Sequence, residues 1–187
     1  MTETRLLGIS GSLRAQSTNT LLVHEAARAF APTTFVMGDI RLPLFDEDLE
    51  TSGGIPEAVE ALAAEIKAAD AIVISTPEYN KNLSGSLKNA LDWVSRVKGA
   101  PWAGKPVAVL SAAAGRAGGE RAQYSLRHCL VPFRPRLIPG PEVMIAGAGK
   151  AFGPEGRLLD EKAFEFLGGL MSALRDEVDL VRAAQGS

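Results

Sequence analysis

The stretch RLLGISGSLRAQSTNTLLVHEAARAF (residues 5–30) decides the fold. It opens with an apolar, strand-like run at residues 5–10 and closes with a helix-like pattern at residues 20–30. The loop between them, GSLRAQSTN (11–19), carries a glycine, three hydroxyl side chains, an arginine and an asparagine. A strand that leads through a short polar loop into a helix is the opening of a βαβ unit, so this stretch predicts an α/β fold.

Four further segments have the short, apolar or β-branched character of strands. They are TTFVM (33–37), DAIVIST (70–76), PVAVLSA (106–112) and PEVMIAG (141–147). The runs at 70–76 and 106–112 are nearly continuous, which is typical of strands that are buried on both faces of a sheet.

Helical patterns alternate with these strands. Apolar residues recur at three- and four-residue steps over 57–69, 86–97 and 160–182, and Asp160 is placed to cap the last of these helices. Five strands and five helices in alternation predict a five-stranded parallel sheet with right-handed crossovers, covered by helices on both faces.

Two segments are expected to be loops because of their Gly, Pro and charge content. They are DEDLETSGGIP (46–56) and GKAFGPEGR (149–157). Neither is long enough to divide the chain, and 187 residues suit one core, so we predict a single domain over residues 1–187.

Composition excludes several classes of function. Apolar residues make up 46% of the chain and charged residues 22%, as in ordinary globular proteins. The net charge of −2 and the lack of a basic stripe argue against a nucleic-acid partner. The sequence has no run of 18 apolar residues, and its first residues do not show a basic start followed by a long apolar stretch. We therefore expect no membrane association and a cytoplasmic location.

Metal chemistry is not expected either. Cys129 is the only cysteine, which rules out an internal disulfide and a cysteine-rich metal site. His24 and His128 are far apart in the sequence, and no metal-ligand spacing links them to other ligating residues.

Three loops follow strands of the predicted sheet: residues 10–19, 76–86 and 111–120. In open parallel sheets, ligands bind beyond the carboxyl ends of the strands, where the strand order reverses. These loops are therefore the candidate site.

The first loop suits a phosphate group. A helix N-terminus offers unpaired N–H groups and partial positive charge, to which Arg14 would add charge and Ser12, Ser17 and Asn19 would add donors. The simpler alternative is that Ser17 or Thr18 only caps the helix and that the rest is a solvated turn.

Three better-known motifs do not fit this place. A nucleotide P-loop ends in Gly-Lys-Ser/Thr, which the chain lacks. A hydrolase elbow needs G-x-S-x-G, whereas GISGS places Ser12 at the final glycine, so a hydrolase is a remote alternative. The Rossmann pattern is absent here, and GRAGG (115–119) resembles it only faintly and follows the wrong strand.

The second loop lies in TPEYNKNLSGSLKNALDWVSR (76–96). Pro77 favours extended or turn geometry, Tyr79 offers a flat ring, and Asn80 offers both donors and an acceptor. The loop would suit the edge of a flat heteroaromatic ligand, and it would equally suit a rigid turn.

Four motifs in this order and spacing resemble the NADPH-dependent FMN reductase family, in its branch of quinone and chromate reductases. They are GSLRAQSTN, TPEYNKNLSGSLKNALDWVSR, AGKPVAVLSAAAG (103–115) and GGERAQYSLRHCL (118–130). The resemblance extends over nearly the whole chain. It implies a flavodoxin-like three-layer sandwich with strand order 2-1-3-4-5 that holds FMN without a covalent bond.

The resemblance also implies site residues. Those expected around the FMN phosphate are Ser12, Arg14, Ser17, Thr18 and Asn19. Those expected beside the isoalloxazine are Pro77, Glu78, Tyr79 and Asn80, with the loop from Ser111 to Gly115 on the flavin's other side. A substrate or subunit network is implied for Arg96, Arg121, Tyr124 and Glu142, in a homodimer or homotetramer. For those four, the alternative is ordinary surface ion pairing.

The implied activity is hydride transfer from NADPH or NADH through FMN to a quinone or a similar acceptor such as chromate, an azo compound or free flavin, with ping-pong kinetics. The flavin would carry the chemistry, so no catalytic side chain is expected. The alternatives are an electron carrier of the flavodoxin type and a module that senses FMN or redox state.

Some positions depart from the family pattern. Relatives usually carry proline at the position of Ser84 and hydroxyl residues near Ala112 and Ala113, and the segment 81–83 also differs. We expect a looser second loop, one flavin contact fewer and an altered substrate pocket.

Overall fold

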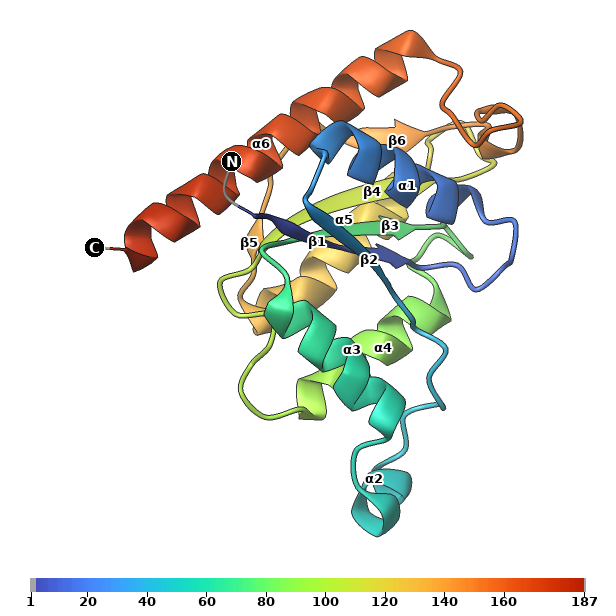
Figure 1. Cartoon of the computed structure of the whole chain (residues 1–187). Helices are drawn as coiled ribbons and strands as arrows, with labels where there is room; N and C mark the ends of the chain where they lie inside the picture. Colours follow the sequence, from blue (N-terminus) through green and yellow to red (C-terminus); the bar gives the residue numbers. More distant parts are fainter. Residues whose placement is uncertain (1–2, 187) are drawn as a thin grey trace.

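The computed structural model describes residues 3–186, which form one six-stranded parallel sheet with helices on both faces (Figure 1). The path through the sheet is β2 (Thr34–Gly38), β1 (Arg5–Ser10), β3 (Ala71–Thr76), β4 (Pro106–Ala112) and β5 (Arg136–Leu137). This confirms the expected order 2-1-3-4-5 and the flavodoxin-like fold. Residues 1, 2 and 187 of the expected domain lie outside the described part.

The last strand differs from the expectation. In place of one strand at 141–147, two short strands pair with β4: β5 with its beginning and β6 (Val143–Ile145) with its end. Pro139 and Pro141 lie between them, and because proline has no N–H to donate, the ladder is interrupted there.

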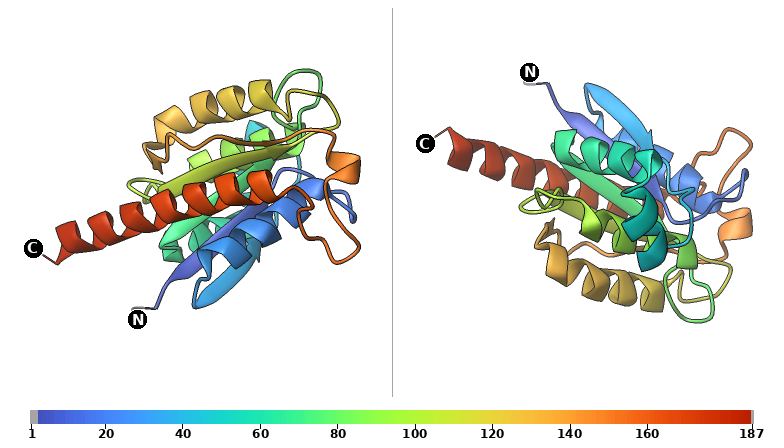
Figure 2. Two further views of the ribbon diagram at one scale, coloured as in Figure 1. Left: turned by 90° about the horizontal axis from the view of Figure 1, so that it is seen from above. Right: turned by 90° about the horizontal axis from the view of Figure 1, so that it is seen from below.

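The helices divide between the two faces of the sheet. They are α1 (Thr18–Phe30), α3 (Glu57–Ala68), α4 (Gly85–Arg96), α5 (Glu120–Leu130) and α6 (Glu161–Gln185). Helices α1 and α6 pack on one face and α3, α4 and α5 on the other; Figure 2 shows α1 and α6 in front of the sheet in one view and α3 in the other. The expected cap of the last helix is confirmed, since Asp160 accepts from the N–H groups of Lys162 and Ala163.

Alternation along the strands feeds the two cores. Leu6 of β1 joins the core under α1 and α6, while Leu7 and Ile9 join the core under α3, α4 and α5. Every residue of β3 and β4 is buried, as their continuous apolar sequence predicts.

The segment 46–56, expected to be a loop, contains the short helix α2 (Glu47–Gly53), which projects from the body beyond α3 and α4 (Figure 1). Asp46 caps it, and acidic residues in its first turn suit the helix dipole. None of its residues is buried, so it carries no apolar periodicity to predict it.

Two short 3₁₀ turns complete the structure: η1 (Val131–Phe133) and η2 (Ala148–Lys150). The second expected loop, 149–157, begins within η2 and is closed by a bridge between Phe152 and Leu158. No helix in residues 3–186 is long and apolar enough to cross a membrane.

Candidate functional site

Strands β1, β3 and β4 run parallel and in register, so the loops that follow them meet at one edge of the sheet. Together these loops enclose a first cavity of about 320 Å³. Its lining comes from all three loops and from η2: Ser12, Arg14, Ser17, Thr18, Asn19, Pro77, Glu78, Tyr79, Ala112, Ala113, Ala114, Ala148 and Gly149. The structure therefore brings together most of the residues that the sequence singled out.

The N-terminus of α1 forms one end of this cavity. Ser17 is its cap, and its Oγ accepts from the N–H groups of Asn19 (3.2 Å) and Thr20 (3.3 Å). Within residues 3–186, the N–H groups of Gln16 and Thr18 meet no acceptor, and the guanidinium of Arg14 has no partner. The start of α1 is thus capped and still presents a surface of free N–H groups and an unpaired cation.

Asn19 lies below this surface and is only 2% exposed. Its Nδ2 donates to the carbonyl of Ala112 (2.9 Å), and its Oδ1 accepts from Ser75 Oγ (2.8 Å) and from the N–H of Ala112 (3.0 Å). The side chain thereby joins α1 to the ends of β3 and β4. Its bonds hold the cavity wall in place.

The second loop forms a tight turn, and part of it lines the first cavity. Tyr79 and Asn82 exchange backbone hydrogen bonds of 3.0 and 3.1 Å, which makes a tight turn with Asn80 and Lys81 at positive φ. Pro77, Glu78 and Tyr79 line the cavity, whereas Asn80 lies exposed at the tip of the turn. The tight turn therefore holds Pro77, Glu78 and Tyr79 at the wall of the cavity.

Ser84 connects the first two loops. Its Oγ caps α4 by accepting from the N–H of Leu87 (3.3 Å), and it donates to the carbonyl of Gly11 (2.5 Å). The expected loosening at this departure from the family pattern is not what the structure shows, because the serine hydroxyl supplies a direct tie between the loops.

The third loop rests on Ser111, which is fully buried and absent from the cavity lining. Its Oγ donates to the carbonyl of Gly118 (2.6 Å) and accepts from Gln123 Nε2 (2.9 Å). Gly118 and Gly119 both have positive φ, and a Cβ there would lie 2.6 Å from the backbone of Met144 and 2.7 Å from the side chain of Ser111, respectively. The loop is packed too closely at these two positions for any side chain.

A second cavity of about 460 Å³ adjoins the first. It is lined by Glu78 and by residues 113–121, among them Gly115 and Arg116, and it shares Glu78, Ala113 and Ala114 with the first cavity. Arg121 borders it and holds Glu78: its N–H donates to Oε2 (3.2 Å), and its Nη1 lies 3.6 Å from Oε1. The mouth of the site is thus fixed from the start of α5.

The other residues of the implied network are dispersed in the single chain. Arg96 pairs with Glu50 of α2 at 2.8 Å. Tyr124 and Glu142 lie near Arg127: burial lowers the pKa of Arg127, and these two neighbours oppose that shift. The interpretation as surface ion pairing fits Arg96 within this chain.

Comparison with known proteins agrees with this geometry. A family model described as NADPH-dependent FMN reductase matches residues 4–150. The chain belongs to this family. It is 46% identical over 173 residues to an NAD(P)H-dependent FMN reductase of Pseudomonas aeruginosa, covering 91% of this chain and 93% of that protein.

Two further relatives match this reductase over nearly its whole length. A quinone reductase of Escherichia coli is 35% identical over 183 residues, covering 95% of this chain and 97% of its own. The solved structure of FerB, a flavoenzyme NAD(P)H:(acceptor) oxidoreductase from Paracoccus denitrificans, superposes with a TM-score of 0.84 at 32% identity, covering 94% and 97% of the two chains. The reductase is accordingly an oxidoreductase of the FMN and NAD(P)H type.

The residues present fit FMN. The free N–H groups at the start of α1 and the unpaired Arg14 suit a phosphate dianion, and small residues at 112–114 leave room opposite the second loop. For FMN to bind here, the protein itself has to supply only donors for the phosphate and a flat space for the ring.

Sequence reasoning missed one wall of the cavity. Ala148 and Gly149 of η2 close it from the segment after β6, well beyond the last motif, which ends at Leu130. Neither residue has a reactive side chain, and the only signal was the run of small residues in AGAGKAFG (146–153).

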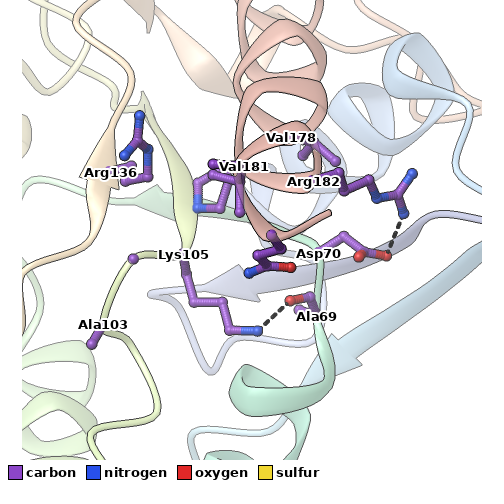
Figure 3. Close-up of a pocket in the computed structure, with 12 residues that line it drawn as sticks. Ala69, Asp70, Ala103, Lys105, Arg136, Val178, Val181 and Arg182 are labelled. Atoms are coloured by element: carbon purple, nitrogen blue, oxygen red, sulfur yellow. Dashed lines mark hydrogen bonds and ion pairs between the residues drawn. The ribbon is translucent and has the colours of Figure 1, made fainter. Parts of the chain in front are cut away.

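Another cavity, of about 330 Å³, lies at the opposite edge of the sheet beside the end of α6 (Figure 3). Its cations are already engaged: Arg182 pairs with Asp70 (3.1 Å), Arg136 with Glu177, and Lys105 Nζ donates to the carbonyls of Lys67 and Ala69. Burial lowers the pKa of Lys105, with Asp70 opposing the shift. These cations are engaged in contacts within the fold, so the first cavity remains the candidate site.

Proposed function

We propose that this reductase passes hydride from NAD(P)H to a quinone, with FMN held in the first cavity. The observation that carries the proposal is the meeting of the unpaired start of α1 and Arg14 with the turn at Pro77–Tyr79 around one cavity. The quinone reductases among its relatives support this acceptor, while chromate, azo compounds and free flavin are further candidates.

When bound, FMN supplies the hydride-transfer chemistry. Arg14 and the N–H groups at the start of α1 would bind the phosphate, with Ser12, Ser17 and Thr18 around it. Pro77, Glu78 and Tyr79 would orient the ring, and Asn19 and Ser111 would support the walls from below. In this proposal Asn80 shapes the turn.

The second cavity would receive the nicotinamide and the acceptor in turn. Arg121 stands at its border and is the candidate to attract the phosphates of NADPH or an anionic acceptor. Because Glu78 partly neutralises Arg121, its attraction for anions would be moderate.

A homodimer or homotetramer and a cytoplasmic location are parts of the same proposal. The family network implied for Arg121, Tyr124 and Glu142 would form between subunits. Tyr124 is 53% exposed and available for such a contact.

The decisive experiment is an absorption spectrum of the purified protein after mixing with FMN and filtration, followed anaerobically as NADPH is added. Retained flavin that bleaches promptly and is reoxidised by a quinone is the expected result. Retained flavin that stays oxidised with both NADPH and NADH would favour an electron carrier or a sensor. If no flavin is retained, the assignment of the cavity fails.

The Arg14→Ala variant should bind FMN about 10- to 100-fold more weakly, because a hydrogen bond to a charged group is worth about 1.5–3 kcal/mol. Quenching of FMN fluorescence measures the dissociation constant. Lys98→Ala, which removes an exposed cation on the connection after α4, is the matched control and should leave it unchanged. Equal affinities of the Arg14→Ala variant and the wild type would remove Arg14 from the site.

A further inference from the structure

The buried carboxylate of Glu25 has no part in the function described so far. It lies in the third turn of α1, and its side chain is only 1% exposed. Burial of an acid is costly unless it is paired and hydrogen-bonded, so its partners show what it holds.

All the partners of Glu25 lie either on α1 or on the segment 147–159. Its Oε1 pairs with Arg28 of α1 and with Arg157 Nε at 3.0 Å, and its Oε2 accepts from the N–H of Leu158 at 3.0 Å. Arg28 adds a bond from Nη2 to the carbonyl of Gly156 (3.2 Å). Glu25 and Arg28 thus clamp the far end of this segment to α1.

A continuous series of hydrogen bonds leads from the clamp to the cavity. The N–H of Leu159 donates to the carbonyl of Ala151 (3.0 Å), and the N–H of Ala151 donates to the carbonyl of Ala148 (3.3 Å). Ala148 lines the cavity and is joined to the third loop through Ala113 (3.1 Å). Displacement at residues 157–158 would therefore shift the wall formed by Ala148 and Gly149.

Helix α1 contacts the cavity directly and also contacts one of its walls through Glu25. Its N-terminus borders the first cavity, and Glu25, two turns further along, holds the segment that includes the wall residues Ala148 and Gly149. A rigid helix with both attachments fixes the position of this wall relative to the start of α1.

We propose that Glu25 is a positioning residue that sets the affinity for FMN by fixing the segment 147–159 against α1. The inference rests on the proposed function, since it takes FMN as the occupant of the first cavity. Phe152 and Leu158 also pack against the core under α1 and α6, so the variants below keep the segment folded near its place.

The test compares Glu25→Gln, Arg157→Gln and the double variant with the wild type. Glutamine keeps an acceptor for Leu158 but loses both ion pairs, so we expect the dissociation constant of FMN to rise about tenfold as the ordered wall becomes less populated. Arg157→Gln should give a smaller rise. The double variant should bind no more weakly than Glu25→Gln alone, because both changes break one linkage.

Two measurements separate positioning from general stability. Hydrogen exchange of the apoprotein should be faster at the amides of Gly153, Leu158 and Leu159 in Glu25→Gln and unchanged in β3. Glu65→Gln, which breaks the Arg5–Glu65 pair on the other face of the sheet, is the matched control and should leave FMN affinity unchanged.

Weaker FMN binding together with locally faster exchange supports the proposal. Faster exchange with unchanged FMN affinity overturns the coupling, and unchanged exchange overturns the clamp. Fully additive effects of the two single changes would show that Glu25 does not act through Arg157. A wild-type protein that retains no FMN instead refutes the proposed function, and the exchange data still report on the clamp separately.

Discussion

Ser84 shows how much one hydroxyl can contribute at the scale of a residue. Its Oγ accepts from the N–H of Leu87 at the start of α4 and donates to the carbonyl of Gly11 in the first loop. A proline at this position could provide neither bond, because it has no hydroxyl. The Ser84 hydroxyl therefore ties the first two loops directly.

The Ser84→Ala variant should lose about 1 kcal/mol of unfolding free energy from the missing cap and bind FMN more weakly from the missing tie. Urea unfolding of the apoprotein and FMN titration measure the two effects. Ser86→Ala is the control, since its Oγ lies 3.4 Å from the same carbonyl and adds little. Wild-type behaviour in both assays would show that the Ser84 bond has no energetic weight.

At the scale of elements, α1 organises the carboxyl edge of the sheet. Asn19 links it to β3 and β4 through three hydrogen bonds that are all buried. These bonds are made to residues 56 and 93 positions away in the sequence. The sequence therefore indicated Asn19 as a donor beside the phosphate but not as a link to β3 and β4.

The Asn19→Ala variant should be destabilised by roughly 2–4 kcal/mol, because the buried groups of Ser75 and Ala112 lose their partners. The measurement is the urea unfolding midpoint of the apoprotein. Ser17→Ala, which removes only the cap of the same helix, should cost about 1 kcal/mol. If the two variants were equally stable, the buried bonds of Asn19 would contribute no more than a helix cap.

We also expect the stability of the protein to depend on pH through His24 of α1, which packs edge-on against Phe35. Burial, with a smaller effect of Arg28, lowers the pKa of His24 below its ordinary 6.5. The unfolded chain therefore takes up this proton first on acidification, so stability is complete above about pH 6.5 and falls below it.

The His24→Gln variant should consequently lose less stability than the wild type between about pH 6.5 and 5, as followed by urea midpoints at a series of pH values. Parallel curves for His24→Gln and the wild type would exclude His24 as the source.

The elements themselves were predictable where burial imposes a period. The strands β1 to β4 and the helices α3, α4 and α6 were placed from apolar spacing, because each presents a face to one of the two cores. Helix α2 has no buried residue. The division between β5 and β6 arises at the prolines between them, and both strands pair with β4, which is distant in the sequence. Neither feature leaves a local apolar signal.

At the scale of the whole molecule, one edge of the sheet offers two adjoining cavities that share Glu78, Ala113 and Ala114. With the first filled by cofactor, donor and acceptor would have to use the second in turn. Double-reciprocal plots for NADPH at several quinone concentrations should then be parallel. Intersecting lines would mean that donor and acceptor bind together.

The site was predictable as far as its loops, and less so in its walls. The three loops follow from strand order and motif, which bring Ser12, Arg14 and Tyr79 to one cavity. The support by Ser111 and the clamp at Glu25 depend on where side chains point after the chain has folded, and η2 contributes only backbone and small side chains.

The close packing of Gly118 and Gly119 sets a boundary for directed evolution of this enzyme. Every amino-acid replacement at either codon adds a Cβ, which would meet Met144 or Ser111 at less than 3 Å. A library meant to broaden the range of acceptors should keep these two codons constant. Diversity belongs at Gly115 and Arg116, which are exposed and line only the second cavity, where new side chains would reshape the entrance while the first cavity stays intact.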